Sequence, residues 1–441
     1  MKPLALILAL SIVGMTLPAA AVDLPTALQA AQANDPTFAS ARSNRDAATE
    51  NVAITRSRLL PQVSFQSTIQ HLNQTTVQSG TPHDFSGQSR NSTLSLRQGV
   101  YRPRDWAGAA VGELQAQYGQ YQFGAAQSDV WNRAVGVWID VLGSQTLRDH
   151  YARSVESATN SAEQEKRRLQ AGDGTRDAVA EAVAVLAQAR AQLADAELDL
   201  KSKEQAFRLL TRLDPASFRT FRLPEADKLA LPVPSEAEML SRVLDNSAEL
   251  QGARIAEAVA QKRLDQVSSD HRPTLDMIGS VSRAENDATN TLGLKYNNHQ
   301  IGVQLVVPIY SGGGVSATQR QAAAQYAAAT TDREAVEQKL RTQVAVDWNA
   351  QVGLRERALA AKELVASARE QRRAAERGIR AGLRTWTEAS AADQLIARRG
   401  ADQTSLLVGI VKTQAKLLAL LPVSDPAWDE WSRALSALAI P

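Results

Sequence analysis

Two groups of charged side chains, each a few residues after a glycine, are the first candidates for a functional role. Arg384 and Glu388 come directly after Gly382 and lie four residues apart. Residues four apart face each other on a helix, so these two can form a surface ion pair worth about 0.2–0.5 kcal/mol. In the first half of the chain, Gly172 is followed in the same way by Arg176, Asp177 and Glu181. The chemistry available to both groups is electrostatic.

The sequence contains no residue pattern typical of a catalytic site or a metal site. The chain has no cysteine, which excludes disulfides, thiolate ligands, a thiol nucleophile and a lipid-modified N-terminal Cys. Ser311 to Gly314 looks like a phosphate-binding loop, but no Lys-Ser or Lys-Thr follows it. The histidines show no short ligand spacing, since they stand at His71, His83, His150, His271 and His299. We therefore expect no enzyme, no metal and no cofactor.

Composition and the N-terminus limit the partners and the compartment. The net charge is only +2, and no face gathers the basic residues, so we expect no nucleic-acid partner. Residues 1–21 have the pattern of a signal peptide, with an apolar run from Leu4 to Leu17 and small residues at Ala19 and Ala21. No later run of about 18 apolar residues could form a membrane-spanning helix, so we expect any membrane passage to use strands.

The chain repeats itself with a period of about 210 residues. Arg168 to Gly172 recurs as Gly378 to Gly382, and the Pro61 motif that opens one alternating segment recurs at Pro273. Two further pairs of anchors agree with this offset. Between the two copies, residues 213–234 contain four prolines and are predicted to form a linker rather than a helix.

Each copy contains two segments in which apolar and polar residues alternate. Val63, Phe65 and Ile69 alternate with polar residues, and so do Ile301 and Val303. The pattern predicts strands at 62–73 and 91–101, and at 273–283 and 299–309. The polar segments 74–90 and 284–298 are predicted to be surface loops. Strands of this kind suit either a membrane barrel or a soluble sheet.

The rest of each copy is helical. No proline occurs between Asp105 and Gln170, and a continuous helix there would be on the order of 100 Å long. After it, apolar residues recur every seven positions from Val179 to Phe207, which predicts a coiled-coil seam. Each copy should therefore end in a long helical hairpin, at about 104–212 and about 314–421. Since four strands cannot close a barrel and an open edge is not tolerated in lipid, a membrane form must oligomerise.

At this point the chain resembles the TolC family of outer-membrane efflux and secretion channels. The resemblance lies in Leu60-Pro61-Gln62, in the run from Leu96 to Tyr101 with Trp106, in Val307 to Gly313, and in the two hairpin turns. It implies an α+β membrane protein, a homotrimer with a β-barrel of about twelve strands. It also implies a periplasmic tunnel made of an equal number of helices. Such a tunnel carries cargo across the outer membrane of a Gram-negative bacterium from an inner-membrane pump and a periplasmic adaptor.

The resemblance gives roles to the residues at the hairpin ends. In this family an Arg of the second hairpin holds the periplasmic end closed and acidic residues ring the pore. The resemblance places Arg384 at the Arg position and Glu388 at the first acidic position. The second acidic position falls on Ala391, which departs from the family pattern. Arg176, Asp177 and Glu181 are the candidate partners. Three copies of Glu388 near one axis would favour cations; the alternative is the ordinary surface pair described above.

The turn residues themselves are candidates for contact with the adaptor, namely Gly172, Thr175, Gly382, Leu383 and Thr385. Capping of the following helix is the alternative for the two threonines.

The expected domains are a signal peptide (1–21), a first repeat (22–212), an equatorial linker (213–234), a second repeat (235–421) and a C-terminal equatorial tail (422–441). We favour type I protein secretion through an ABC transporter, because the chain lacks the lipid-modified Cys of many drug-efflux channels. Efflux of drugs with a proton-driven pump is the alternative. A soluble coiled-coil adaptor is a third hypothesis, which the paired strands and hairpins disfavour.

Overall fold

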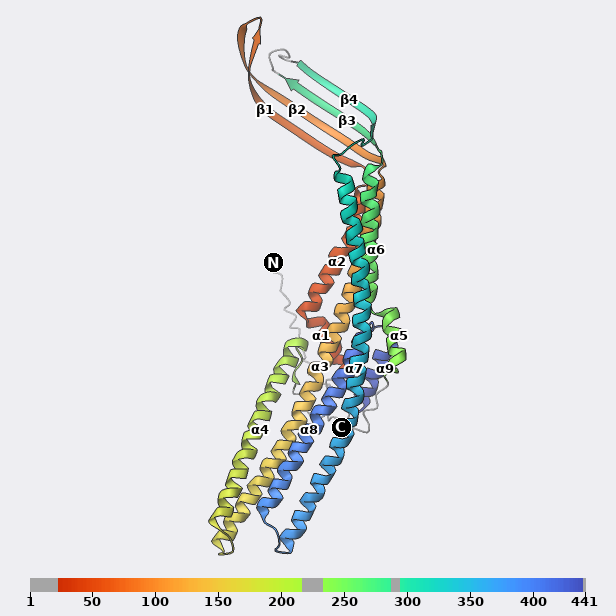
Figure 1. The fold of residues 1–441 in the computed structure, drawn as a ribbon. Helices are drawn as coiled ribbons and strands as arrows, with labels where there is room; N and C mark the ends of the chain where they lie inside the picture. The colour runs from red at the N-terminus through yellow and green to blue at the C-terminus, as the bar shows by residue number, and fades with distance from the viewer. Residues whose placement is uncertain (1–22, 216–232, 287–293, 439–441) are drawn as a thin grey trace, which may run out of the picture.

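The computed structural model describes residues 23–215, 233–286 and 294–438. Figure 1 shows an elongated molecule with a sheet at one end, long helices that continue from it, and two helical hairpins at the other end. The strands are β1 (Gln62–Gln78), β2 (Thr81–Tyr101), β3 (Thr274–Asn286) and β4 (Leu294–Val306). The helices are α1 (Leu24–Asn34), α2 (Pro36–Ser57), α3 (Pro103–Gln170), α4 (Arg176–Thr211), α5 (Glu236–Asn246), α6 (Ala248–Ser268), α7 (Gly314–Arg380), α8 (Trp386–Ala419) and α9 (Pro426–Leu438).

The helices come in pairs of matching length. α1 and α5 each have 11 residues, α2 and α6 have 22 and 21, α3 and α7 have 68 and 67, and α4 and α8 have 36 and 34. The break between α1 and α2 is made by Asp35, which accepts a hydrogen bond from the Thr37 backbone N–H at 3.0 Å. Ser247 stands at the corresponding break between α5 and α6. The predicted duplication is therefore confirmed element by element.

The four strands form one antiparallel sheet in the order β1-β2-β3-β4. Directly paired residues share a face, and alternate residues along a strand do so too. One face carries apolar rows such as Phe65–Leu94–Val281 and Val63–Leu96–Gly279–Ile301. The opposite face carries polar rows such as Ser64–Ser95–Ser280–Gln300. The sheet is thus apolar on one side and polar on the other, as a membrane barrel requires.

The predicted loop 74–90 is wrong, because the strands β1 and β2 continue through it. The hairpin turns at Ser79 and Gly80, whose φ angles are 54° and 85°, and Gln78 pairs with Thr81. Two consecutive positive φ angles make the tight turn whose twist matches that of the strands. Polar cross-strand bonds support the extended hairpin: Thr75 Oγ1 donates to Asp84 Oδ1 at 2.6 Å. Polar composition alone therefore did not mark a loop.

The second strand pair is also displaced from its prediction. β3 continues to Asn286 and β4 begins at Leu294, so the predicted loop 284–298 is too long; residues 287–293 lie outside the description. β4 ends at Val306, three residues before the predicted end. Pro308 explains the early end, because proline lacks the N–H that the ladder needs. Ile309 and Tyr310, expected at the strand end, are 93% and 87% exposed beyond it.

The predicted heptad seam packs α4 against α3. Its alanines are buried at Ala182, Ala189 and Ala196, and so are Leu200 and Phe207. Small side chains at a repeating position let two helix backbones approach closely. The seam holds the first hairpin together along its length, and the second hairpin pairs α7 with α8 in the same way.

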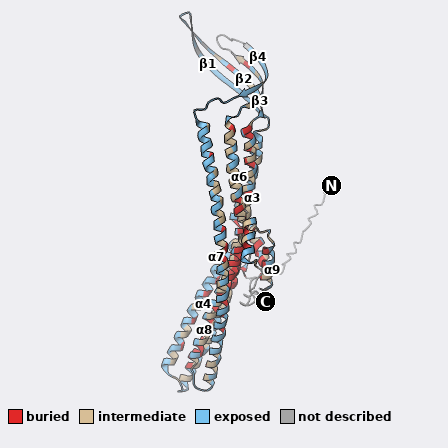
Figure 2. Cartoon of the chain, turned by 45° about the vertical axis from the view of Figure 1, so that its right-hand side comes forward, coloured by how far each residue is buried: buried red, intermediate tan, exposed pale blue. Residues whose placement is uncertain are grey.

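The main core lies at the waist, halfway along the helices, where Figure 2 shows the buried residues gathered near α9. Trp138, Trp428 and Trp431 are fully buried. The ring of Trp428 packs edge-on against Trp131 of α3 at 5.3 Å between centroids. Trp431 Nε1 donates to Gln414 Oε1 of α8 at 3.0 Å. The tail helix α9 therefore ties α3 to α8.

None of the helices in the described part of the chain combines the length and the apolar character that a membrane crossing needs. The predicted signal peptide and residues 216–232 of the predicted linker lie outside the described residues.

Candidate channel entrance

The two hairpins end side by side at the end of the molecule farthest from the sheet (Figure 1). Gly172 and Gly382 take the positive φ angles, 84° and 73°, that close the two turns. The hydroxyl of Thr175 accepts from the Ala178 backbone N–H, and that of Thr385 accepts from the Glu388 backbone N–H, both at 3.2 Å. Thr175 and Thr385 therefore cap the starts of α4 and α8, as the capping alternative predicts.

Arg384 and Glu388 lie together at the second turn. Arg384 Nε is 3.7 Å from Glu388 Oε2, and both side chains are about half exposed, 48% and 50%. Glu388 also accepts from the Thr385 backbone N–H at 3.4 Å, which completes a capping box. The stem of Arg384 lies over Gly378, where a Cβ atom would come within 2.7 Å of Arg384 Cγ. The glycine thus leaves room for the arginine, whose direction is set by the turn.

The charged residues of the first turn do not join them within one chain. Arg176, Asp177 and Glu181 are exposed at the start of α4. Among the described residues, none of the three forms an ion pair with Arg384 or Glu388. The structure therefore brings together the second set alone, and any contact between the sets would need neighbouring subunits.

A polar cluster that sequence reasoning missed joins three helices above the turns. Arg372 of α7 donates from Nε to Asp393 Oδ2 of α8 at 2.7 Å, and each side chain is 22% exposed. Ser157 of α3 donates to the same Asp393 oxygen. Arg372 also pairs with Glu376, 2.6 Å away and four residues on. We call these four residues the Arg372 cluster. Only the Arg372–Glu376 spacing was visible in the sequence, because the other contacts cross between helices.

The contact between α3 and α8 changes character along its length. At the waist it is apolar, with Leu142, Leu407 and Val411 buried. Towards the turns it contains buried hydroxyls that have no hydrogen-bond partner among the described atoms, at Ser154, Ser161, Thr387 and Ser390. A cavity of about 220 Å³ borders this part and is lined by Ser161, Ser390 and the Arg372 cluster residues Ser157, Arg372 and Asp393. Such hydroxyls stabilise the contact less than the apolar packing at the waist does.

His150 lies where the polar part of this contact begins. Its ring packs on Gly400 of α8, where a Cβ atom would come within 2.8 Å of the ring. Burial lowers the pKa of His150, and the nearby Arg153 and Arg369 lower it further, whereas Asp149 acts in the opposite direction. Burial and the two arginines thus disfavour the protonated form of the ring.

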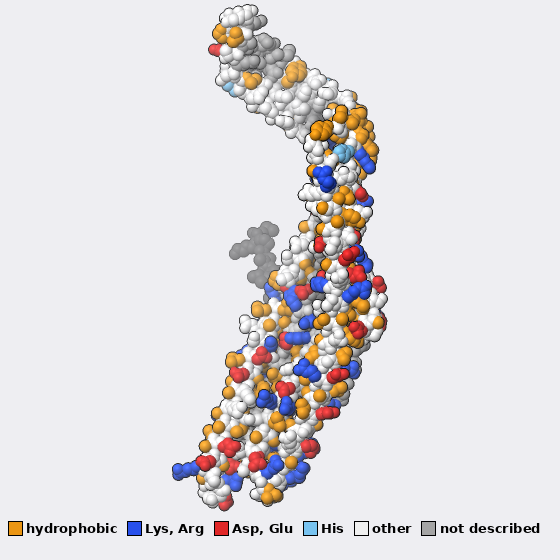
Figure 3. Space-filling model, in the orientation of Figure 1, with side chains coloured by type: hydrophobic (Ala, Val, Ile, Leu, Met, Phe, Trp, Pro, Cys, Tyr) orange, Lys and Arg blue, Asp and Glu red, His pale blue; other side chains and the backbone are white. Residues whose placement is uncertain are grey.

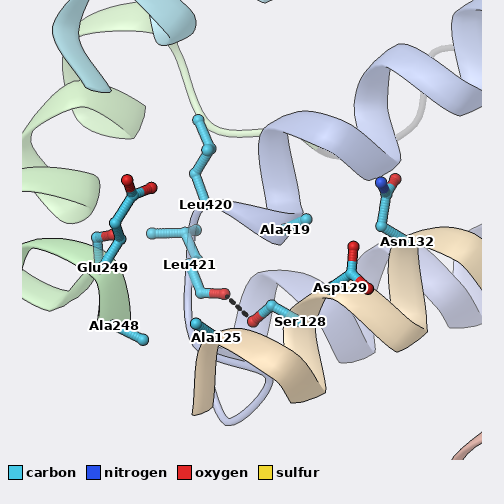
Figure 4. A pocket seen from close by; sticks show the side chains of 10 residues that line it. Ala125, Ser128, Asp129, Asn132, Ala248, Glu249, Ala419, Leu420 and Leu421 are labelled. Atoms are coloured by element: carbon cyan, nitrogen blue, oxygen red, sulfur yellow. Dashed lines mark hydrogen bonds between the residues drawn. The ribbon is translucent and has the colours of Figure 1, made fainter. Parts of the chain in front are cut away.

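On the face of the described residues drawn in Figure 3, charge is not gathered into a single patch. On the face drawn in Figure 3, both signs are mixed over the helices, and few charged side chains occur on the sheet. A cavity of about 180 Å³ at the waist is lined by Asp129 and Glu249 on opposite sides, with Ser128 donating to the Leu421 carbonyl at 3.0 Å (Figure 4). Both carboxylates are already paired, Asp129 with Arg133 and Glu249 with Lys339. This cavity is structural.

The chain was compared with known proteins. The family model described as outer membrane efflux protein matches residues 27–211 and 239–421, which are the two repeats. The outer membrane protein TolC of Vibrio cholerae is 28% identical over 364 residues, covering 80% of each chain. The proteases secretion protein PrtF of Dickeya chrysanthemi is 28% identical, covering 70% of this chain and 68% of PrtF.

The solved structure of the outer membrane protein VceC from Vibrio cholerae has the same fold, with a TM-score of 0.74, 15% identity, and coverage of 90% of this chain and 96% of VceC. The strands with one apolar face, the duplicated helical hairpins and the match over both repeats agree with one another. This chain therefore belongs to the outer membrane efflux protein family, the TolC-like channels of Gram-negative outer membranes, which carry cargo and catalyse no reaction.

Proposed function

We propose that this chain is the outer-membrane channel of a type I protein secretion system. The observation that carries the proposal is the likeness to PrtF, a proteases secretion protein, over 70% of this chain. Cargo would pass from an inner-membrane ABC transporter through a periplasmic adaptor into the helical tunnel. Small-molecule efflux with a proton-driven pump is the second candidate, favoured by the family description as efflux proteins.

Family membership implies a trimeric channel that works with a pump system. The unpaired edges of β1 and β4 support this assembly, since the four strands of one chain cannot close on themselves. In the arrangement that we propose, β4 pairs with β1 of the next subunit, the apolar face meets lipid and the helices stand in the periplasm. The hairpin turns, at Gly172, Thr175, Gly382, Leu383 and Thr385, would then contact the adaptor.

We further propose that the hairpin ends form a gate. Three copies of Glu388 near the axis would concentrate negative potential at a narrow entrance, and Arg384 would direct its carboxylate. The candidate partners Arg176, Asp177 and Glu181 would come from a neighbouring subunit, since they are unpaired with Arg384 and Glu388 in one chain. The weak polar part of the α3–α8 contact supports this proposal, because it is where the second hairpin would part from the first.

The secretion proposal is tested by deleting the gene and measuring two outputs in the same strain. Loss of extracellular protease with unchanged sensitivity to dyes and detergents is the expected result. Increased dye sensitivity with normal secretion would support efflux instead.

The gate is tested by recording the Glu388→Gln trimer in a planar bilayer. Because Gln keeps the size of Glu, the expected change is a loss of cation preference and of block by divalent cations. Unchanged conductance and unchanged block would leave the surface ion pair as the whole role of Glu388.

A further inference from the structure

A group of cations lies on the apolar face of the sheet, at the end of its apolar band. Val281 closes this band on β3, where it pairs with Leu94 and His299. Two residues further along β3 stands Arg283, paired with Asn297. Two residues beyond it, Arg90, Glu285 and Lys295 form the next row together with Ile69 of β1, the last apolar residue of the band. All these residues share the face of Val281, because alternate residues of a strand point the same way.

This group carries more positive than negative charge. Lys295 pairs with Glu285, the one carboxylate of the two rows. Arg90 donates to the amide oxygen of Gln88 at 3.2 Å, and Arg283 is exposed and forms no ion pair within the described part of the chain. Three cations therefore face one carboxylate. We call Arg90, Arg283 and Lys295 the rim cations.

The position of the rim cations relative to the apolar band is defined by the strand register. On β3 the band runs from Leu275 to Val281, and Arg283 stands about 7 Å beyond it at roughly 3.4 Å per residue. On β1 the band reaches Ile69 in the row of Arg90, so the rim cations stand at the end of the band. At the other end of the band the boundary is aromatic, with the rings of Tyr101 and Trp106 packed edge-on at 5.3 Å. Aromatic rings suit the level of the headgroups at a membrane surface, whereas Lys and Arg reach for anionic groups.

We propose that the rim cations bind the phosphate groups of a phosphorylated glycolipid in the outer leaflet. The inference rests on the proposed orientation, with the helices in the periplasm and the strand hairpins towards the exterior. In that orientation the rim lies just above the acyl chains of the outer leaflet, and the outer leaflet of a Gram-negative outer membrane is built from a phosphorylated glycolipid. Arginine binds phosphate with two parallel N–H groups, and the two arginines stand in neighbouring rows.

The test measures binding of bis-phosphorylated lipid A to the detergent-purified trimer by native mass spectrometry and by thermal shift. A cation next to an anionic lipid surface is worth about 1 kcal/mol, or roughly a fivefold change in affinity. The combined variant Arg90→Gln, Arg283→Gln, Lys295→Gln should therefore bind on the order of tenfold or more weakly. Binding equal to the wild type would overturn the proposal.

A matched variant removes three exposed arginines at the opposite end of the sheet, where the helices begin: Arg58→Gln, Arg272→Gln and Arg320→Gln. It loses the same charge and should bind lipid A as the wild type does. The paired variant Arg90→Lys, Arg283→Lys keeps the charge and should retain most of the binding. Equal losses in the matched variant would show that net charge alone attracts the lipid, which overturns the proposal.

Two probes on the wild-type trimer separate the sources of binding. Dephosphorylated lipid A should bind weakly, and inorganic phosphate should give no thermal shift. A full effect from either probe contradicts the proposal, since it would point to the acyl chains or to a simple anion site. These arms decide the matter even if the combined variant does not assemble. Conductance in a phosphatidylcholine bilayer should survive the rim substitutions, so its loss would be a failure of the channel and not of the lipid site.

Discussion

The Arg372 cluster gives the sharpest test of the proposed gate at the hairpin ends. Replacing Asp393 by Asn keeps the shape of the side chain but removes the negative charge to which Arg372 and Ser157 donate hydrogen bonds. Within the cluster, only the Ser157–Asp393 hydrogen bond joins the first hairpin to the second, because Arg372 and Asp393 both belong to the second hairpin. Hydrogen bonds to charged groups contribute about 1.5–3 kcal/mol, and Asn retains a weaker acceptor, so the loss when the hairpins part is about 1 kcal/mol per subunit. If three subunits open together, the closed state loses about 3 kcal/mol, which shifts the ratio of open to closed by on the order of 10²-fold.

The assay is single-channel recording of the Asp393→Asn trimer in a planar bilayer, with the fraction of time at high conductance as the readout. Entry of a large antibiotic into cells expressing the variant gives a second readout. The matched control is Glu370→Gln, which removes an equal charge from an ion pair with Arg373 whose side chains are 62% and 63% exposed. An exposed pair contributes little, so this variant should behave as the wild type. Equal open fractions for Asp393→Asn and the wild type, with the trimer intact, would refute the reasoning.

Three further predictions concern the helices. Gly112→Ala should lower the temperature at which the trimer dissociates, because the new Cβ would lie 2.1 Å from Thr55 Oγ1 and 2.8 Å from the Asn51 carbonyl. The control is Gly136→Ala, whose Cβ would meet nothing within 4 Å and which should stabilise the helix by about 1 kcal/mol. Because the pKa of His150 is lowered in the folded protein, the unfolded chain binds the proton more tightly, and the free energy of unfolding should fall as the pH drops below 6.5. Thermal melts between pH 7.5 and 5 should therefore show a smaller loss of stability for His150→Gln than for the wild type. Thr385→Ala should cost about 1 kcal/mol through loss of the cap and speed hydrogen exchange in the first turn of α8, whereas unchanged exchange would contradict the capping role.

The long helices were predictable because their signal is local and repeated. A helix that packs along its whole length must place small or apolar residues at one position of every heptad, and Ala182, Ala189 and Ala196 do so. The duplication helped for the same reason, since each copy checks the other.

The strand ends could not be predicted because they depend on pairing between residues on neighbouring strands. The residues around Ser79 and Gly80 are polar and include no Asn-Gly or Asp-Gly pair, so the turn was hidden in what looked like one long loop. Polar side chains that bond across the two strands support their continuation, as Ser67 does with Ser92 at 3.0 Å. Such pairing depends on register, which composition does not reveal.

The contacts at the candidate entrance also differ in whether the sequence could predict them. Arg384 and Glu388 are four residues apart on one helix, and their contact is visible in the sequence. Asp393, Arg372 and Ser157 lie on three helices, and only the packing of α3, α7 and α8 brings them together. The proposed ring of three Glu388 copies would depend on assembly of the trimer, which adds a further step beyond the fold of one chain.

The central claim, that this chain assembles into a trimeric conduit through a membrane, is tested most directly by extraction and recording. The protein should stay in the membrane fraction until detergent is added, emerge as a trimer, and give discrete single-channel steps in a planar bilayer. Recovery from the periplasm without detergent, as a soluble species that produces no conductance, would contradict the account.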